Sequence, residues 1–271
     1  MEAASYMIFY LLWIPAALTT LGVFCIWTAL SKWWILLVLP LAFLLWNGLY
    51  LLYTWIICRR VDIHGEWKGI SPFYQKNTLL FIDWLLAVTR VSYELRGTEW
   101  LPEGEFLLVS NHRSAFDPLA THAALRDRPF AFISKPENIY KLYLGAAAWS
   151  AGYLPIDREN ARNALKTINA AADRMKNHIC SYGIYPEGTR TKDGNLQEFH
   201  HGSFKAAQKA HVPVVIMATE NTEQVLKNFP FRRTKVVLTI LETIDADEVK
   251  ASKTSALAEH TQALLLEYLG H

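Results

Sequence analysis

Two long apolar segments near the N-terminus constrain this chain more than any other feature of its sequence. Residues 6–30 contain no charged side chain, and residues 33–58 repeat that pattern after a break at Ser31 and Lys32. Each segment exceeds the roughly 20 apolar residues that cross the hydrocarbon core of a bilayer. Tryptophan and tyrosine side chains cluster near the segment ends, as they do at membrane interfaces. The sequence therefore predicts a membrane-anchoring helical hairpin over residues 1–60.

Basic residues at the end of the second segment predict the orientation of this hairpin. Arg59 and Arg60 follow the segment directly, and basic residues favour the cytoplasmic side of a membrane. We therefore expect the rest of the chain on the cytoplasmic face of the cell (inner) membrane. A hairpin that dips into one leaflet, or two core helices of a soluble protein, are the alternatives. A cleavable signal peptide is disfavoured, because no basic region precedes the first segment and a second one follows at once.

The rest of the chain has balanced charge. The net charge of the whole chain is +2, which Glu2, Lys32, Arg59 and Arg60 already account for. No basic patch indicates nucleic acid as a partner. The three cysteines show neither metal-site spacing nor a disulfide framework, which favours a reducing compartment.

Beyond the hairpin, the pattern indicates a linker and one α/β domain. In the linker, residues 61–90, the stretch 78–88 is apolar apart from Asp83, and we interpret it as an interfacial helix. Over residues 91–271, short apolar strands alternate with helical stretches. The predicted strands are 106–109, 130–133, 184–185, 212–217 and 236–241, and the predicted helices are 118–125, 160–177, 202–210 and 252–268. This alternation predicts a central mixed sheet flanked by helices.

The first segment with candidate chemistry runs from Asn111 to Pro118, between a predicted strand and a predicted helix. Asp117 suits an N-cap and Pro118 the first helical position, so His112 and Asp117 flank a loop. On one continuous helix the two side chains would point about 140° apart, whereas a loop can bring the carboxylate to the imidazole. Such a pair is a general base for a substrate hydroxyl. A histidine that merely caps a loop is the alternative.

Three further segments follow in order. Residues 185–190 end in Arg190, whose planar guanidinium suits a phosphate, and Gly188 permits close approach of a ligand to the backbone. Residues 152–158 end in Arg158, a second candidate phosphate ligand. Taken singly, each segment is also compatible with an ordinary turn or a solvated strand end. Residues 212–217 form an apolar strand suited to core packing or to lining an acyl groove.

Together and in this order, these segments resemble the phosphatidic-acid-forming acyltransferases of the glycerolipid acyltransferase superfamily. His112 and Asp117 match that family's block of Asn-His, four residues and Asp, and residues 186–190 match its third block. Residues 154–158 and 212–215 resemble the second and fourth blocks, although Pro155 stands where an aromatic residue is common. The resemblance covers residues 94–217, and the N-terminal helical pair is similar to the membrane motif of bacterial members.

The resemblance implies an activity and a set of site residues. His112 would be the base and Asp117 its orienting partner. An acyl group would pass from acyl-CoA or acyl carrier protein to the sn-2 hydroxyl of lysophosphatidic acid, forming phosphatidic acid, with no metal or other cofactor. The partners are then a membrane lipid, the acyl donor and the bilayer. The residues expected to bind the acceptor and its phosphate are Lys135, Arg158, Glu187, Gly188, Thr189 and Arg190.

Three other functions stay open at this point. The acceptor could instead be glycerol 3-phosphate, another lysophospholipid or a lipid-linked sugar. A lipid-binding scaffold without turnover is a second alternative, which the His112–Asp117 pair disfavours. A metal hydrolase is the third, but the adjacent His200 and His201 lack the i, i+4 spacing of helical zinc ligands. We interpret these two histidines as solvated loop residues.

Overall fold

The computed structural model describes residues 17, 19–22, 35–140, 145–190 and 196–270. The chain divides into two compact units, Met1–Asp62 and Ile63–His271. In the first unit, residues 17 and 19–22 are helical, and the remainder of the first predicted hairpin helix lies outside the described residues. The second predicted helix is present as α2 (Ile35–Cys58).

Helix α2 has the character of a lipid-facing helix. Its segment Pro40–Cys58 has a mean hydropathy of 1.7 and is long and apolar enough to cross a membrane. Large apolar side chains such as Leu41 and Leu44 are exposed, at 63% and 64%. The amide of Asn47 donates to the Phe43 carbonyl at 2.6 Å, so this polar group is satisfied inside the helix, as hydrocarbon surroundings require.

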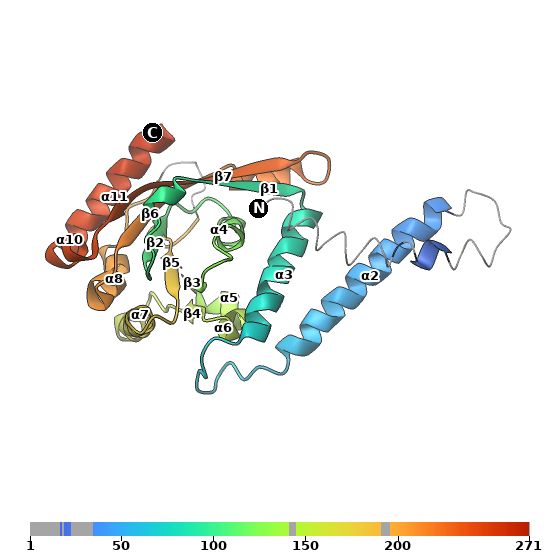
Figure 1. The fold of residues 1–271 in the computed structure, drawn as a ribbon, viewed down its shortest axis with the longest axis horizontal. Helices are drawn as coiled ribbons and strands as arrows, with labels where there is room; N and C mark the ends of the chain where they lie inside the picture. The colour runs from blue at the N-terminus through green and yellow to red at the C-terminus, as the bar shows by residue number, and fades with distance from the viewer. Residues whose placement is uncertain (1–16, 18, 23–34, 141–144, 191–195, 271) are drawn as a thin grey trace. The chain divides into compact units, whose positions relative to one another are not determined.

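A seven-stranded mixed sheet forms the centre of the second unit, in the order β1-β7-β6-β2-β5-β3-β4 (Figure 1). Neighbouring strands pair in parallel except β6 and β7, which are antiparallel. The predicted central mixed sheet is therefore confirmed. The strands are β1 (Val91–Arg96), β2 (Leu107–Ser110), β3 (Phe130–Ser134), β4 (Leu154–Pro155), β5 (Ser181–Ile184), β6 (Val214–Glu220) and β7 (Thr234–Ile244).

Helices cover both faces of this sheet (Figure 1). In β2, Leu107 packs into a core shared with α7, α8 and α11, whereas Leu108 packs into a core shared with α3 and α4. Both leucines are fully buried, which explains the continuous apolar sequence of this strand. The helices are α3 (Pro72–Val88), α4 (Asp117–Ala124), α5 (Pro136–Tyr140), α6 (Gly145–Ser150), α7 (Ala161–Lys176), α8 (Lys205–Ala210), α9 (Val225–Asn228), α10 (Ala246–Ala251) and α11 (Thr254–Leu269), with short 3-10 turns η2 (Thr98–Trp100), η3 (His201–Phe204) and η4 (Thr222–Gln224).

Helix α7 follows directly from its sequence. The Asn160 side chain caps it by accepting from the N–H groups of Arg162 and Asn163 at 3.1 and 3.2 Å, a contact that typically stabilises a helix by about 1 kcal/mol. Ile168 and Met175 lie on the buried face. The helix therefore occupies residues 161–176, within the predicted range of 160–177.

Helix α3 is longer than the predicted stretch 78–88 and packs into the second unit. It begins at Pro72, which suits the first turn of a helix. Ile82 and Leu86 are buried, and the Asp83 carboxylate accepts from the Arg126 guanidinium at 2.8 and 2.7 Å. The charge that interrupts this apolar stretch is thus one half of an ion pair inside the domain. Contact of α3 with lipid stays a prediction.

The segment before α3 is held by a buried arginine. The Arg174 guanidinium lies 3.4 Å from the centre of the Trp67 ring. It donates to the Gly152 carbonyl and to the Tyr182 hydroxyl, both at 2.9 Å. A cation over an indole face is favourable, more so when it is removed from water. The residues around Trp67 are therefore fixed to α7 and β5.

Candidate active site

Parallel strands bring the predicted site residues to one edge of the sheet. Strands β4, β3, β5, β2 and β6 all run in the same direction, so their carboxyl ends meet where open α/β sheets bind ligands. The segments leaving these ends carry Lys135 after β3, Arg158 after β4, Glu187 after β5, and both His112 and Asp117 after β2.

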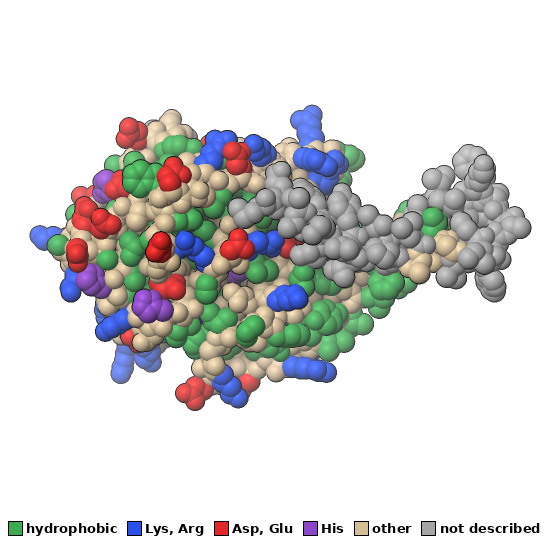
Figure 2. Space-filling view, viewed as in Figure 1, with side chains coloured by type: hydrophobic (Ala, Val, Ile, Leu, Met, Phe, Trp, Pro, Cys, Tyr) green, Lys and Arg blue, Asp and Glu red, His purple; other side chains and the backbone are tan. Residues whose placement is uncertain are grey.

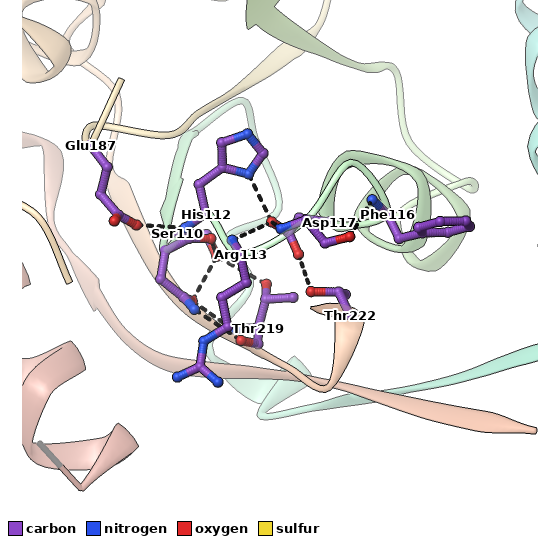
Figure 3. Close-up of polar contacts among 10 residues, drawn as sticks. Ser110, His112, Arg113, Phe116, Asp117, Glu187, Thr219 and Thr222 are labelled. Carbon is purple, nitrogen blue, oxygen red and sulfur yellow. Dashed lines mark hydrogen bonds and ion pairs between the residues drawn. The ribbon is translucent and has the colours of Figure 1, made fainter. Parts of the chain in front are cut away.

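The His112 and Asp117 side chains are in direct contact (Figure 3). His112 Nδ1 lies 2.7 Å from Asp117 Oδ2. The same oxygen accepts the N–H groups of Arg113 and Ser114 at 2.7 and 2.8 Å, and Asp117 Oδ1 accepts the hydroxyl of Thr222. Asp117 is completely buried. These donors offset the large cost of removing a carboxylate from water.

The prediction that Asp117 is an N-cap is wrong. Asp117 is the first residue of α4, and Phe116 occupies the cap position. The Asp117 carboxylate turns back toward the loop and binds the backbone N–H groups of Arg113 and Ser114. The motif therefore uses this side chain to close the loop around His112, which is a stronger constraint on the imidazole than a helix cap would give.

The contact fixes which nitrogen of His112 is free. A carboxylate without a proton only accepts hydrogen bonds, so Nδ1 carries the hydrogen and Nε2 is left as the acceptor. The His112 side chain is 19% exposed, against 0% for Asp117. The imidazole can therefore meet a substrate while its partner stays out of water.

Glu187 supports the same loop through its backbone. Its Oε1 accepts the N–H of His112 at 2.6 Å, and its Oε2 accepts the N–H of Gln197 at 3.2 Å. The residue is 3% exposed. Glu187 therefore connects the segment after β5 to the loop of residues 111–117, which we call the catalytic loop. Spacing along the sequence alone did not indicate this role. Its predicted role toward the acceptor stays a prediction.

Asn111 anchors the loop on the other side. Its side-chain amide donates to the Thr219 carbonyl at 2.9 Å, and its oxygen accepts the Thr219 N–H at 2.8 Å. Ser110 adds a hydroxyl contact to the Thr219 side chain at 3.0 Å (Figure 3). This pairing extends the β2–β6 ladder by one residue. The position of Asn111 directly after a buried strand was the available signal, but its partner in β6 is too distant in sequence to predict.

Tyr185 is a site residue that the sequence reasoning missed. Its ring stacks on the His112 imidazole with centroids 4.3 Å apart and planes at 14°. It also stacks on Phe132 at 5.4 Å. Burial raises the pKa of the Tyr185 phenol well above its ordinary value, so the ring is neutral. The sequence analysis placed Tyr185 at the start of the segment 185–190 but gave it no role.

Gly188 brings two further segments together. Its φ of +73° is left-handed, and a Cβ atom there would lie 2.9 Å from both Arg158 Nη1 and His200 Nε2. Glycine avoids both these close contacts and the strain that a left-handed backbone imposes on other residues. The Arg158 guanidinium therefore lies against the turn after β5, with the His200 ring beside it.

Three of the cationic side chains predicted to bind phosphate make no ion pair in the described part of the chain. Within the described residues, Arg158, Arg190 and Lys135 make no ion pair, and their side chains are exposed. Burial of part of the Arg158 guanidinium lowers its pKa, as expected for a cation without a nearby carboxylate. Thr189 is also exposed. The structure brings Arg158 to Gly188, but it shows no contact that joins Lys135, Thr189 or Arg190 to them.

A pocket of about 540 Å³ opens beside Arg158. Its lining combines apolar side chains of α7 with basic side chains, a combination that suits an amphipathic ligand. The apolar residues are Ala164, Leu165 and Ile168, the basic ones are Arg158, His200 and Lys205, and Glu198 adds one acidic side chain. Tyr185 also lines it, which places the pocket next to the ring that contacts His112.

Sequence comparison identifies the central part of this unit. Residues 92–220, which include β2 to β6 and the His112–Asp117 loop, match the sequence model of the family described as Acyltransferase. This segment is therefore similar to the Acyltransferase family.

Individual Acyltransferase relatives share less than a third of their residues with the chain. The 1-acyl-sn-glycerol-3-phosphate acyltransferase of Salmonella typhimurium is 29% identical over 162 residues, 60% of this chain and 66% of that protein. The 1-acyl-sn-glycerol-3-phosphate acyltransferase alpha of Bos taurus is 29% identical over 191 residues, 69% of this chain and 65% of that protein. The chain therefore spans just under two thirds of each relative's length.

A solved structure supports the fold of this Acyltransferase domain. The 1-acyl-sn-glycerophosphate (LPA) acyltransferase PlsC from Thermotoga maritima superposes with a TM-score of 0.56 and 20% sequence identity, covering 83% of this chain and 88% of that one. Within the described residues, no group of three or more His, Cys, Asp or Glu side chains is arranged to hold a metal ion.

Proposed function

We propose that this protein transfers a fatty acyl group from a thioester to the sn-2 hydroxyl of lysophosphatidic acid, forming phosphatidic acid in phospholipid synthesis. The observation that carries the proposal is the His112 imidazole, oriented by buried Asp117 at 2.7 Å and 19% exposed. The match to the Acyltransferase family model and the names of the similar proteins support the same reaction.

The proposed mechanism moves one proton in two steps. His112 Nε2 takes the proton of the acceptor hydroxyl as its oxygen attacks the thioester carbonyl. Asp117 keeps its charge and stabilises the imidazolium that forms. The tetrahedral intermediate then collapses, the carbon–sulfur bond breaks, and the imidazolium returns the proton to the leaving thiolate. No protein nucleophile is needed, because the acceptor supplies the attacking oxygen.

In this proposal, the cationic side chains without an ion pair bind the phosphate of the acceptor. A phosphate accepts bidentate hydrogen bonds from a guanidinium, and Arg158 is close to the catalytic loop through its contact with Gly188. We assign the acceptor phosphate to Arg158 and Arg190, with Lys135 and Thr189 as further ligands from the same edge. Gly188 and Glu187 shape the floor of this site.

The membrane holds both the enzyme and its lipid substrate. The apolar helix α2 is suited to the bilayer, and Arg59 and Arg60 at its end favour the cytoplasmic side for the catalytic unit. Both acyl-CoA and acyl carrier protein are water-soluble thioester donors available on that side. The reaction then takes its acceptor from the cytoplasmic leaflet and its donor from solution.

The test is acyl transfer by the full chain purified in detergent. Thiol release and labelled phosphatidic acid are measured with lysophosphatidic acid and, in separate reactions, acyl-CoA or acyl carrier protein. We expect acceptor-dependent transfer, and His112→Ala should lower kcat by about 10²–10⁴-fold because the general base is lost.

His211→Ala is the matched control for this substitution. His211 is exposed and pairs with Asp247 on α10 at 2.8 Å, so its loss should leave turnover unchanged. Near-full turnover in the His112→Ala variant would remove the base assignment. Thiol release that does not require lysophosphatidic acid would indicate thioester hydrolysis instead.

A further inference from the structure

The connection between β6 and β7 exposes apolar side chains to solvent. Leu226, Phe229 and Phe231 are 70%, 40% and 87% exposed. We call residues 225–233 the docking loop. Scattered apolar residues are normal on a protein surface, but a group of this kind on one short connection indicates a binding surface.

Basic residues surround these apolar side chains. Lys227, Arg232 and Arg233 belong to the docking loop, and all three are exposed. Arg90 lies beside it and donates to the carbonyls of Pro230 and Phe231 at 3.0 and 3.3 Å. Within the described residues, none of these four cations forms an ion pair. Arg90 thus holds the backbone of the docking loop, and the basic side chains remain available to bind an anionic partner.

The loop projects from the edge of the sheet that carries the active site. Because β7 is antiparallel to β6, it begins at the edge where β6 ends. Glu220, the last residue of β6, pairs with Val237, so residues 234–236 extend beyond β6 by about 10 Å at roughly 3.3 Å per residue. Figure 2 shows basic side chains next to a hydrophobic one at the end of the domain where β7 begins.

Two contacts connect the docking loop to the catalytic loop. The Thr222 hydroxyl donates to Asp117, and Glu223 pairs with Arg113 at 3.9 Å. Both residues belong to the turn η4, which leads directly into α9 and the docking loop. A partner surface that binds the docking loop would therefore lie close to the side from which a substrate reaches His112.

We propose that the docking loop is a second membrane contact of this protein, with its apolar side chains in the headgroup region of an anionic bilayer. Apolar side chains flanked by lysine and arginine are the chemistry that binds an anionic lipid surface. Three apolar side chains are too few for a stable protein interface, which needs about 1,000 Å² of buried area. The contact presents the active-site edge to the leaflet that holds the lipid acceptor.

A fluorophore on the loop tests this contact without any measurement of activity. Phe231→Cys is labelled with an environment-sensitive dye in the full chain with its native cysteines replaced by serine, after a melting curve has shown that the variant folds. The protein is reconstituted into vesicles of phosphatidylcholine alone or mixed with phosphatidylglycerol. Glu248→Cys on α10, at the opposite end of β7, is the matched control.

We expect blue-shifted emission from position 231 that lipids with a quencher in the acyl region reduce by at least about 2-fold, and no change at position 248. Changing Lys227, Arg232 and Arg233 to glutamine should abolish the advantage of phosphatidylglycerol. Water-like emission at 231 in both vesicle types overturns the proposal. A blue shift that follows protein concentration and ignores the lipid identifies a protein partner and also overturns it.

A second measurement rests on the proposed function. The pair Leu226→Ser and Phe231→Ser should lower the rate with vesicle-bound acceptor by about 5–10-fold and leave the rate with a monomeric short-chain acceptor unchanged. Equal losses with both acceptors would show that the loop acts on the site and not on the membrane. Failure of the proposed function would remove both rates, while the fluorescence result would stand.

Discussion

The two halves of the active site differ in how completely their polar groups are paired. In the half that holds the base, the buried carboxylates of Asp117 and Glu187 accept hydrogen bonds from the catalytic loop, and Asn111 is paired with β6. In the half that faces the pocket, Arg158 is exposed and makes no ion pair within the described residues. The polar groups of the first half are paired within the protein, whereas in the proposed function the second half binds an anion.

This difference follows from what each half must do. A base acts quickly when its orientation is already set, because no rearrangement is then needed during the reaction. A phosphate site gains more from leaving its cations unpaired, since an internal carboxylate would compete with the ligand. Because an exposed guanidinium is solvated by water, the absence of an ion pair costs little free energy before the ligand binds. Substitutions in the two halves should therefore produce different kinetic signatures.

The largest effect is expected from Asp117→Asn. The amide removes the negative charge that stabilises the imidazolium and no longer fixes the tautomer of His112. We expect kcat to fall by about 10³–10⁴-fold, as in other oriented imidazole bases, with little change in KM for the acceptor. Stability should fall by about 1–3 kcal/mol, because N–H groups of the loop lose a charged acceptor. Steady-state kinetics and thermal melting measure both.

Asp83→Asn is the matched control for this substitution. Asp83 is also a buried carboxylate, and it pairs with Arg126 at 2.7 Å, but it lies on α3, outside the catalytic loop. It should lose stability to a similar degree while the folded protein keeps its turnover. A similar loss of kcat in both variants would mean that the effect of Asp117 is structural.

The next effect is a pH dependence of the free energy of unfolding, and it arises from His122. This residue lies on α4, the helix that follows the catalytic loop. His122 is 2% exposed and contacts the Tyr153 hydroxyl at 2.8 Å. Burial, with a smaller contribution from Arg126, lowers the pKa of His122 to about 4. Below pH 6.5 the unfolded chain binds the proton more readily than the folded one. Stability should therefore fall by about 3 kcal/mol as the pH drops from 6.5 to 4, at 1.36 kcal/mol per pKa unit.

Thermal melting between pH 7 and pH 4 checks this dependence. The His122→Gln variant should show a smaller fall in melting temperature over that range, because the group that takes up the proton is gone. His260→Gln is the control, since His260 is exposed and pairs with Glu242 at 3.1 Å. Identical pH profiles for wild type and His122→Gln would contradict the buried, neutral state of this histidine.

The fold was predictable from sequence where one strand or helix carried its own signal. The residue patterns of the long apolar strands and of the capped helix α7 predicted these elements, and the structure contains them. Two strands lack such a signal. Strand β1 mixes Tyr93 with the charged residues Glu94 and Arg96, and strand β4 has only two residues. Their pairing with β7 and β3 supplies the order that their sequences do not encode.

The site was predictable where its residues share a short motif. His112 and Asp117 are five residues apart, so a loop argument brings them together. The Asn111–Thr219 pair spans 108 residues, and the stacking of Tyr185 on His112 spans two strands that are neighbours only in the folded sheet. Contacts of this kind depend on strand order. Spacing along the chain does not contain that information.

A smaller effect is expected from Arg158→Gln, in the unpaired half. Loss of a charged hydrogen bond to phosphate should raise KM for lysophosphatidic acid by about 10–100-fold, equivalent to 1.5–3 kcal/mol, while kcat changes little. The acceptor without its phosphate, a monoacylglycerol, should react equally with both enzymes. Arg162→Gln, an exposed position in the first turn of α7, serves as the control. A fall in kcat with unchanged KM would place Arg158 in the chemical step instead.

The smallest effect is expected at Tyr185, where the two halves meet. The ring faces His112 at 4.3 Å, and a cation over an aromatic face gains about 0.5–2 kcal/mol. Because the imidazole becomes positive only during proton transfer, Tyr185→Leu should lower kcat by about 3–10-fold.

Tyr185→Phe separates the ring from its hydroxyl. The Tyr185 hydroxyl is buried, and it is the ring face that stacks on His112, so removal of the hydroxyl should leave kcat unchanged. A Phe variant as slow as the Leu variant would assign the effect to the hydroxyl. A Leu variant with altered KM and normal kcat would make Tyr185 a wall of the pocket. The ring would then belong to the half that binds the acceptor, not to the half that carries the base.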